Sequence, residues 1–133
     1  MEVIALTGRK DSGKSDTLNV LYHLLLASGW TQVPGHFKDL THWDFYDVLT
    51  DGERLLGIVT QGDYATRVPD YLSILAAAGC VMTVCACTTG KPRLSAAIAR
   101  YAPHSFIRKT VGVTPESLRI ANNTDAQHLI TLI

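Results

Sequence analysis

The residues with the clearest chemical capacity form one short run near the start of the chain. From Gly8 to Ser15 the sequence reads G-R-K-D-S-G-K-S, which has the pattern G-x-x-x-x-G-K-S. Glycines allow the backbone to turn tightly, so that consecutive N–H groups can point toward a bound anion. In this pattern the lysine reaches the outer phosphates of a nucleotide and the serine hydroxyl binds Mg²⁺. The run therefore predicts a loop that binds a phosphate chain.

The segments on either side of this run are those that such a loop requires. Val3 to Leu6 is short and apolar, which is typical of a buried parallel strand. From about Lys14 to Ser28 the leucines recur at helical spacing, and Gly29 is well placed to end a helix. The first turn of that helix would add unpaired N–H groups and the positive end of its dipole. A strand, a glycine-bounded loop and a helix therefore follow one another in the expected order.

In these residues the chain resembles the P-loop NTPase superfamily, through its Walker A motif. The resemblance implies one P-loop nucleotide-binding domain over residues 1–133. It also implies ATP or another nucleoside triphosphate as the ligand, and Mg²⁺ as a cofactor. It gives Lys14 the role of holding the β and γ phosphates and Ser15 that of a metal ligand. The residues expected to contact the nucleotide are Gly8, Arg9, Lys10, Asp11, Ser12, Gly13, Lys14, Ser15 and Asp16.

A β-hairpin is predicted near the middle of the chain. Trp43 to Thr50 is rich in aromatic and β-branched residues, and Glu53 to Thr60 becomes steadily more apolar. The dipeptide Asp51-Gly52 lies between these two runs and is a strong short-range signal for a hairpin turn. We therefore expect one antiparallel strand in an otherwise parallel sheet.

The second half of this hairpin ends at Gln61-Gly62-Asp63, where an acidic residue follows a buried strand. In the P-loop superfamily, a carboxylate in such a place is the Walker B acid, which holds Mg²⁺. We expect Asp63 to be this carboxylate and to lie at the end of a strand beside the P-loop strand. Because the acid follows Thr-Gln-Gly and not the apolar run itself, a direct role for Thr60 or Gln61 stays open, as does a plain turn.

The remaining pattern alternates strands and helices, which predicts a three-layer α/β P-loop fold with a mostly parallel sheet. Ligands of such sheets bind at the carboxyl ends of the strands. The other expected elements are a helix after Pro69, a buried strand over Cys80 to Cys87, a short helix over Ser95 to Ala102, a core strand over Ser105 to Val111, a helix from Thr114-Pro115-Glu116 with a break near Asn122-Asn123, and an apolar end, Leu129 to Ile133, that is either helix or edge strand.

Three basic residues follow predicted strands and are expected on the same side as the P-loop, namely Arg67, Lys91 and Arg93. A guanidinium group offers several donors to the oxygens of a transferring phosphoryl group. Arg93 is therefore the candidate catalytic residue outside the P-loop, together with Lys14 and Asp63. The alternative for Arg93 is a solvated position in the first turn of a helix.

The composition narrows the classes of partner. The chain has 133 residues, of which 12 are basic and 12 acidic, so its formal net charge is zero. Nothing therefore indicates nucleic acid or an anionic membrane as a partner. Self-association is unopposed by net charge, so a homo-oligomer is possible. The start lacks a basic segment followed by an apolar stretch, and a cytoplasmic protein is expected. Cys80, Cys85 and Cys87 are expected to pack in the core and not to form disulfides.

The favoured function is a small Mg²⁺-dependent kinase or similar phosphotransferase with an unknown acceptor. The alternative is an NTPase switch or regulatory module that binds or hydrolyses nucleotide to control a protein partner. A structural protein that keeps a nucleotide site without turnover is a third possibility. No Asp-x-x-Gly or Asn-Lys-x-Asp motif is present, so guanine specificity is not supported. His36, Asp39 and His42 are close in sequence, but their spacing matches no metal motif.

Overall fold

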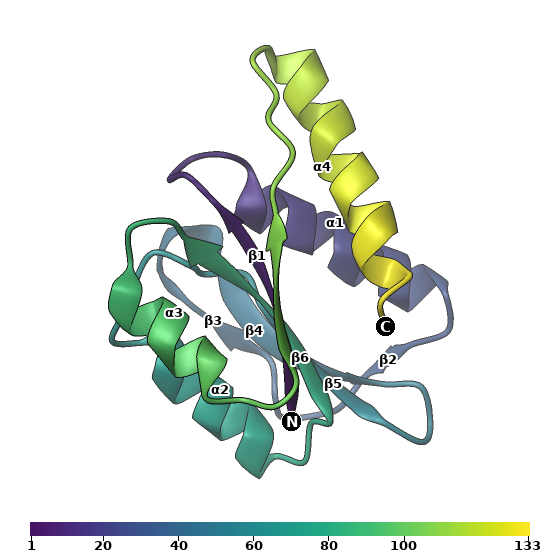
Figure 1. Ribbon diagram of the computed structural model, residues 1–133. Coiled ribbons are helices and arrows are strands. Elements are labelled where there is room, and N and C mark those ends of the chain that lie inside the picture. Colours follow the sequence, from purple (N-terminus) through teal and green to yellow (C-terminus); the bar gives the residue numbers. More distant parts are fainter.

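A seven-stranded mixed sheet and four α-helices make up the fold (Figure 1). The structure is a computed structural model that describes residues 1–133. The strands are β1 (Glu2–Gly8), β2 (Thr31–Gln32), β3 (Lys38–Asp39), β4 (Phe45–Thr50), β5 (Leu55–Val59), β6 (Met82–Thr88) and β7 (His104–Arg108). The helices are α1 (Lys14–Ala27), α2 (Val68–Ala77), α3 (Pro92–Ala99) and α4 (Pro115–Ile130), with a short 3₁₀ helix, η1, at Thr41–Trp43. The predicted α/β class, with a mostly parallel sheet, is confirmed.

The strands lie in the order β2-β4-β5-β6-β1-β7, and β3 also pairs with β4. β5, β6, β1 and β7 run parallel, whereas β4 is antiparallel to β5 across the turn at Asp51-Gly52. The predicted hairpin is therefore confirmed. The sequence did not indicate β2 and β3, because two residues are too few to show the period-2 alternation that marks a strand.

We expected the strand before Asp63 to lie next to β1, the strand that precedes the Gly8 to Ser15 loop. The two strands are not neighbours in the sheet. β6 lies between them, because its Val84 pairs with Ile4 of β1 on one side and with Ile58 of β5 on the other. All three strands are apolar on both faces, so their sequences do not determine which of them is central. Asp63 therefore approaches the loop from Gly8 to Ser15 across the carboxyl end of β6.

The strand predicted over Ser105 to Val111 is β7, which is an edge strand and not a core strand. Along β7 the side chains alternate, with Ser105 and Ile107 half-buried and His104, Phe106 and Arg108 exposed. β7 is paired on one side only, to β1, so it forms an edge of the sheet. The nearby helix α3 also begins at Pro92, earlier than the predicted Ser95, since proline fits the first turn of a helix.

The last helix, α4, is continuous through Asn122-Asn123 and ends at Ile130 without a final strand. Its start is fixed by a capping box, in which Thr114 Oγ1 accepts from Ser117 N and Thr114 N donates to Ser117 Oγ. The predicted break is absent because Asn122 lies on the buried side of the helix, where its Oδ1 accepts from Thr17 Oγ1 at 3.1 Å. None of the helices combines the length and apolar character needed to cross a bilayer.

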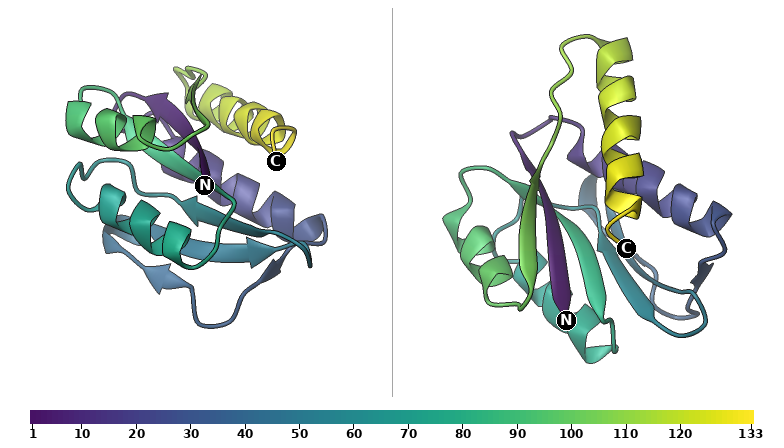
Figure 2. Two further views of the ribbon diagram at one scale, coloured as in Figure 1. Left: turned by 60° about the horizontal axis from the view of Figure 1, so that its bottom comes forward. Right: turned by 45° about the vertical axis from the view of Figure 1, so that its right-hand side comes forward.

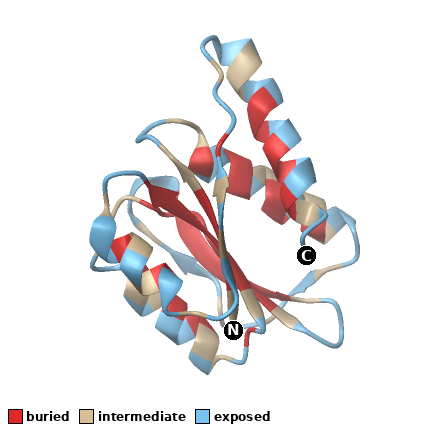
Figure 3. Ribbon diagram, in the orientation of Figure 1, coloured by how far each residue is buried: buried red, intermediate tan, exposed pale blue.

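Helices cover both faces of the sheet (Figures 1 and 2). α1 and α4 pack on one face, whereas α2 and α3 pack on the other. Successive side chains of a strand point to opposite faces. Ile4 and Leu6 of β1 therefore join the core under α1 and α4, while Val3 and Ala5 join the core under α2 and α3. Figure 3 shows the buried residues concentrated in the central strands and on the inner sides of the helices.

Candidate phosphate-binding site

The loop from Gly8 to Ser15 connects β1 to α1 at the carboxyl end of the sheet (Figure 1). Gly13 has φ 92, a left-handed conformation that glycine adopts without steric cost. A Cβ on Gly13 would also lie only 2.6 Å from Asn122 Oδ1. A Cβ on Gly8 would lie 2.8 Å from Ser12 Oγ and 2.9 Å from Lys109 Cβ. Both glycines of the sequence pattern are therefore required by close contacts.

Lys14 is folded back onto its own loop. Its Nζ donates a hydrogen bond to the carbonyl oxygen of Arg9 at 2.6 Å, and the residue is only 6% exposed. Burial lowers the pKa of the Lys14 ammonium, and the negative charge of Asp63 partly opposes that shift. A buried ammonium whose only hydrogen-bond partner is a carbonyl is well placed to bind an anion.

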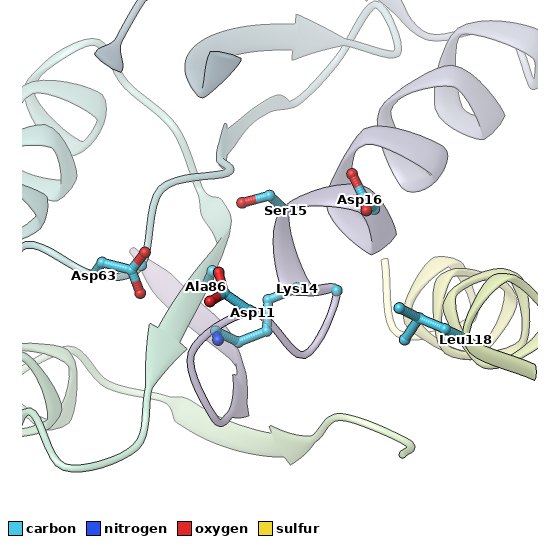
Figure 4. A pocket seen from close by; sticks show the side chains of 9 residues that line it. Asp11, Lys14, Ser15, Asp16, Asp63, Ala86 and Leu118 are labelled. Atoms are coloured by element: carbon cyan, nitrogen blue, oxygen red, sulfur yellow. The ribbon is translucent and has the colours of Figure 1, made fainter. Parts of the chain in front are cut away.

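A cavity of about 260 Å³ opens over the loop and the first turn of α1 (Figure 4). Figure 4 shows Ser15 pointing toward the side on which Asp63 lies, whereas Leu118 projects from α4 on the opposite side. The lining residues are Asp11, Gly13, Lys14, Ser15, Asp16, Gly62, Asp63, Ala86 and Leu118. The structure therefore brings most of the predicted nucleotide-contacting residues to one cavity.

The hydroxyl of Ser15 contacts a carboxylate that the sequence analysis did not identify. Ser15 Oγ lies 2.9 Å from Asp44 Oδ1 and 3.1 Å from the carbonyl oxygen of Thr60. Thr60 Oγ1 donates to the same Asp44 Oδ1 at 2.9 Å. No protein group bonds Asp44 Oδ2, and no cation forms an ion pair with this carboxylate, although the residue is only 9% exposed. Thr60, left open as a candidate, is thus part of the Ser15 network.

The predicted hairpin contained a signal for Asp44. In an antiparallel pair, the start of the first strand lies beside the end of the second. Tyr46 pairs with Val59, so Asp44, which precedes β4, lies beside Thr60, which follows β5. A carboxylate just before the first strand of the hairpin is therefore brought to the carboxyl end of β5.

Asp63 occupies a different part of the site. Its Oδ1 accepts a hydrogen bond from Thr88 Oγ1, at the end of β6. No hydrogen bond joins it to Ser15, whose partners are Asp44 and Thr60. Asp63 lines the cavity over the loop from Gly8 to Ser15, and its charge acts on Lys14. The site thus has two carboxylates, one bonded to Ser15 and one opposite Lys14, and a metal-binding role for Asp63 stays a prediction.

A larger cleft of about 940 Å³ adjoins the first cavity and shares Asp11 and Asp63 with it. It is lined by Arg9, Lys10, Asp11, His42, Asp44, Asp63, Tyr64, Thr88, Thr89, Gly90 and Lys91. Arg93 is exposed in the first turn of α3 and lines neither cavity. Arg67 is also exposed, and its guanidinium lies 5.0 Å from the centroid of the Tyr64 ring. Of the three predicted basic residues, only Lys91 lines this space.

The segment that leads to Asp44 has an unusual backbone. His42 and Trp43 have φ values of 60 and 65, a left-handed conformation that is costly for residues other than glycine. The Trp43 side chain is fully exposed. No group of three or more His, Cys, Asp or Glu side chains could hold a metal by itself, so His36, Asp39 and His42 do not form such a site.

The three cysteines are buried and free. Burial raises the pKa of all three thiols, to about 11 for Cys80. They therefore pack as small apolar side chains, as predicted.

No protein-family model, curated protein or solved structure matches the chain. The chemistry of the site is therefore inferred from its own residues and geometry.

Proposed function

We propose that this protein is a P-loop NTPase-type phosphotransferase that binds a nucleoside triphosphate, with ATP favoured, together with Mg²⁺. The observation that carries the proposal is the loop from Gly8 to Ser15, which connects a buried parallel strand to a helix and borders a polar cavity. The helices on both faces of the sheet support the three-layer form of that fold.

The phosphates would bind at the amino end of α1. The first N–H groups of a helix have no partner within it, and its dipole favours an anion there. Lys14 would exchange its bond to the neutral Arg9 carbonyl for a bond to a phosphate oxygen, in which donor and acceptor are both charged. The buried position of its ammonium holds that charge at the floor of the cavity.

The oxygen atoms around Ser15 fit a magnesium ion. Mg²⁺ prefers oxygen ligands and is usually bound by one or two carboxylates, waters and substrate phosphates. The Ser15 hydroxyl and the unbonded Asp44 Oδ2 are oxygen ligands of this kind, and Asp63 is a second carboxylate nearby. Since no three acidic, His or Cys side chains meet, the metal would arrive with the nucleotide. Bound there, Mg²⁺ would neutralise charge on the β and γ phosphates.

The larger cleft favours phosphoryl transfer to an acceptor over a role as a switch. It borders both Asp44 and Asp63, so it lies beside the part of the site where the terminal phosphate would be. Its volume of about 940 Å³ leaves room for a second molecule.

The alternative, an NTPase switch, is favoured by one observation. The left-handed residues His42 and Trp43 immediately precede Asp44, which bonds the serine of the P-loop. A ligand that altered the Ser15–Asp44 contact would act directly on this segment. Incubation with γ-labelled ATP and separation of the products distinguishes the two functions. Label on an added acceptor supports the kinase, whereas label only in inorganic phosphate supports the switch.

Calorimetric titration with Mg·ATP tests the shared part of both proposals. Lys14→Ala should weaken binding by roughly 1–3 kcal/mol, because a charge-assisted bond to phosphate is lost. Lys38 is an exposed lysine on β3 that lines neither cavity, so Lys38→Ala is the matched control. Unchanged affinity in a folded Lys14→Ala variant would refute nucleotide binding by the P-loop.

A further inference from the structure

We infer that the larger cleft binds the phosphate group of a phosphorylated small molecule, a phosphomonoester, which is the acceptor in the proposed reaction. The inference rests on the proposed function for the position of the transferred phosphate. It rests on the cleft's own residues for the chemistry of the acceptor. The residues that would recognise the phosphate are Arg9, Lys10 and Lys91, so Arg9 and Lys10 would bind the acceptor and not the nucleotide for which the sequence predicted them.

These three cations have no carboxylate partner. The ion pairs of the structure are Arg54–Asp51 and Lys109–Asp125, and neither belongs to the cleft. The cleft is therefore lined by three cations that form no ion pair, although three carboxylates line the same space.

Two of those carboxylates are bonded only by neutral hydroxyl groups and so keep their charge, which Mg²⁺ would offset in the proposed function. Asp44 Oδ1 accepts from Ser15 and Thr60, and Asp63 accepts from Thr88. With Mg²⁺ bound, they would face the metal side of the site. The three cations are then the charges of the cleft that can bind a second ligand, and Asp11 is the one carboxylate left beside them. An anionic ligand is the chemistry that this arrangement recognises.

The shape of the cleft favours a phosphate with an organic part. Its loop side is formed by Thr88 to Lys91, and a Cβ on Gly90 would have no atom within 4 Å, so the backbone there borders open space. Tyr64 is the aromatic residue of the lining, and the Arg67 guanidinium packs over its ring at 5.0 Å. Inorganic phosphate would leave most of the volume empty. A phosphomonoester would place its phosphate at the cations and its remaining part against Tyr64.

The test is calorimetry on protein saturated with Mg²⁺ and a non-hydrolysable ATP analogue, which occupies the P-loop. Two matched pairs are titrated, UMP against uridine and glucose 6-phosphate against glucose. We expect a phosphorylated compound to bind and its unphosphorylated partner not to bind. Lys91→Gln should weaken that binding at least about fivefold, from the loss of one charge-assisted contact, and leave the affinity for the analogue unchanged. Lys38→Gln is the control and should change neither.

The inference is overturned if the analogue-saturated protein binds neither phosphorylated compound, or if Lys91→Gln binds them as tightly as the wild type. Failure of the proposed function is a separate result, in which the analogue itself does not bind. The same titration on nucleotide-free protein then decides. Weakening by Lys91→Gln but not by Lys14→Ala supports a separate phosphate site in the cleft. Weakening by Lys14→Ala alone shows that the compounds bind in the P-loop, and it refutes the cleft.

Discussion

Two buried carboxylates lie on either side of the loop from Gly8 to Ser15, and only one of them has a cation as its partner. Asp125 of α4 lies 3.1 Å from Lys109 Nζ and also accepts from Thr110 N at 2.7 Å and Thr110 Oγ1 at 2.6 Å. Asp44, on the other side of the loop, accepts only hydroxyl groups, and only at Oδ1. Asp125 thus has its own cation, whereas Asp44 has none.

The difference separates a structural carboxylate from one that is suited to a ligand. Burying an ionised group is costly unless it is paired or hydrogen-bonded. Lys109 and Thr110 meet that requirement for Asp125 and fix the segment after β7 to α4. Asp44 borders the larger cleft with one oxygen unbonded, so a cation from solution can complete its environment.

The largest expected effect follows from breaking the ion pair between Asp125 and Lys109. Asp125→Ala would leave the Lys109 ammonium buried without its partner, which typically costs about 3–5 kcal/mol in the free energy of unfolding. Urea denaturation followed by circular dichroism measures this loss. Arg54→Ala removes the protein's exposed ion pair and should have little effect. Equal losses in the two variants would show that Asp125 is not held as an essential partner of Lys109.

Asp44→Asn tests the carboxylate that has no cation as a partner, which we call the open carboxylate. The amide oxygen can still accept from Ser15 and Thr60, so stability should change little. The affinity for Mg·ATP should fall by about 1–3 kcal/mol, the scale of a lost interaction with a charged group. Calorimetric titration with and without Mg²⁺ measures the affinity for ATP under both conditions. A loss of the same size without Mg²⁺ would place Asp44 on the nucleotide and not on the metal.

Asp63→Asn is the matched experiment at the second carboxylate. If Asp63 holds the metal, Mg²⁺-dependent turnover should fall much more than the metal-free affinity for nucleotide. Turnover assays on the Asp44 and Asp63 variants together assign the metal-side carboxylate. Normal turnover in Asp63→Asn would leave it as a residue that positions the loop through Thr88.

A third buried carboxylate, Asp47, extends the comparison because its partners are neutral, like those of Asp44, but both of its oxygens are bonded. It accepts from Tyr22 Oη at 2.7 Å, Gln32 Nε2 at 3.2 Å and Val48 N at 2.8 Å. Tyr22→Phe removes one of these bonds and should cost about 1 kcal/mol in the free energy of unfolding. Urea denaturation near neutral pH measures it. An unchanged free energy of unfolding would show that the other two bonds suffice.

The same substitution has a pH signature. Burial and the bond to Asp47 raise the pKa of Tyr22 from 10.0 to about 12. Between these values the folded state holds a proton that the unfolded state has lost. The contribution of Tyr22 is therefore complete below pH 10 and is lost as pH rises toward 12. In that range, the stability of the wild type should fall more steeply than that of Tyr22→Phe, and parallel profiles would contradict the assignment.

The smallest effect is expected at Arg93. The side chain is exposed and lines neither cavity, so Arg93→Ala should change kcat and KM little. Steady-state kinetics of phosphoryl transfer measure both constants. A joint fall in kcat and kcat/KM with constant KM would instead show a transition-state role, which requires Arg93 to move toward the phosphates.

The sequence was sufficient for features fixed by local residue patterns. The strand and helix on either side of the loop from Gly8 to Ser15, and the turn at Asp51-Gly52, each follow from a few neighbouring residues. The features it did not predict depend on contacts between distant segments. The central place of β6 and the edge position of β7 are set by strand order, on which apolar content gives no information. Asp44 was missed because its partner Ser15 comes from another element, although the hairpin register could have located it.

The full exposure of Trp43 gives this protein an intrinsic optical probe at a useful position. The indole is adjacent in sequence to Asp44, and the chain's other tryptophan, Trp30, lies under the Arg54 guanidinium at 5.3 Å from the centroid of its ring. A Trp30→Phe variant would therefore have a single fluorophore, one residue from the open carboxylate. Emission from a water-exposed indole changes when its surroundings change, so metal and nucleotide could be followed in real time without an attached dye.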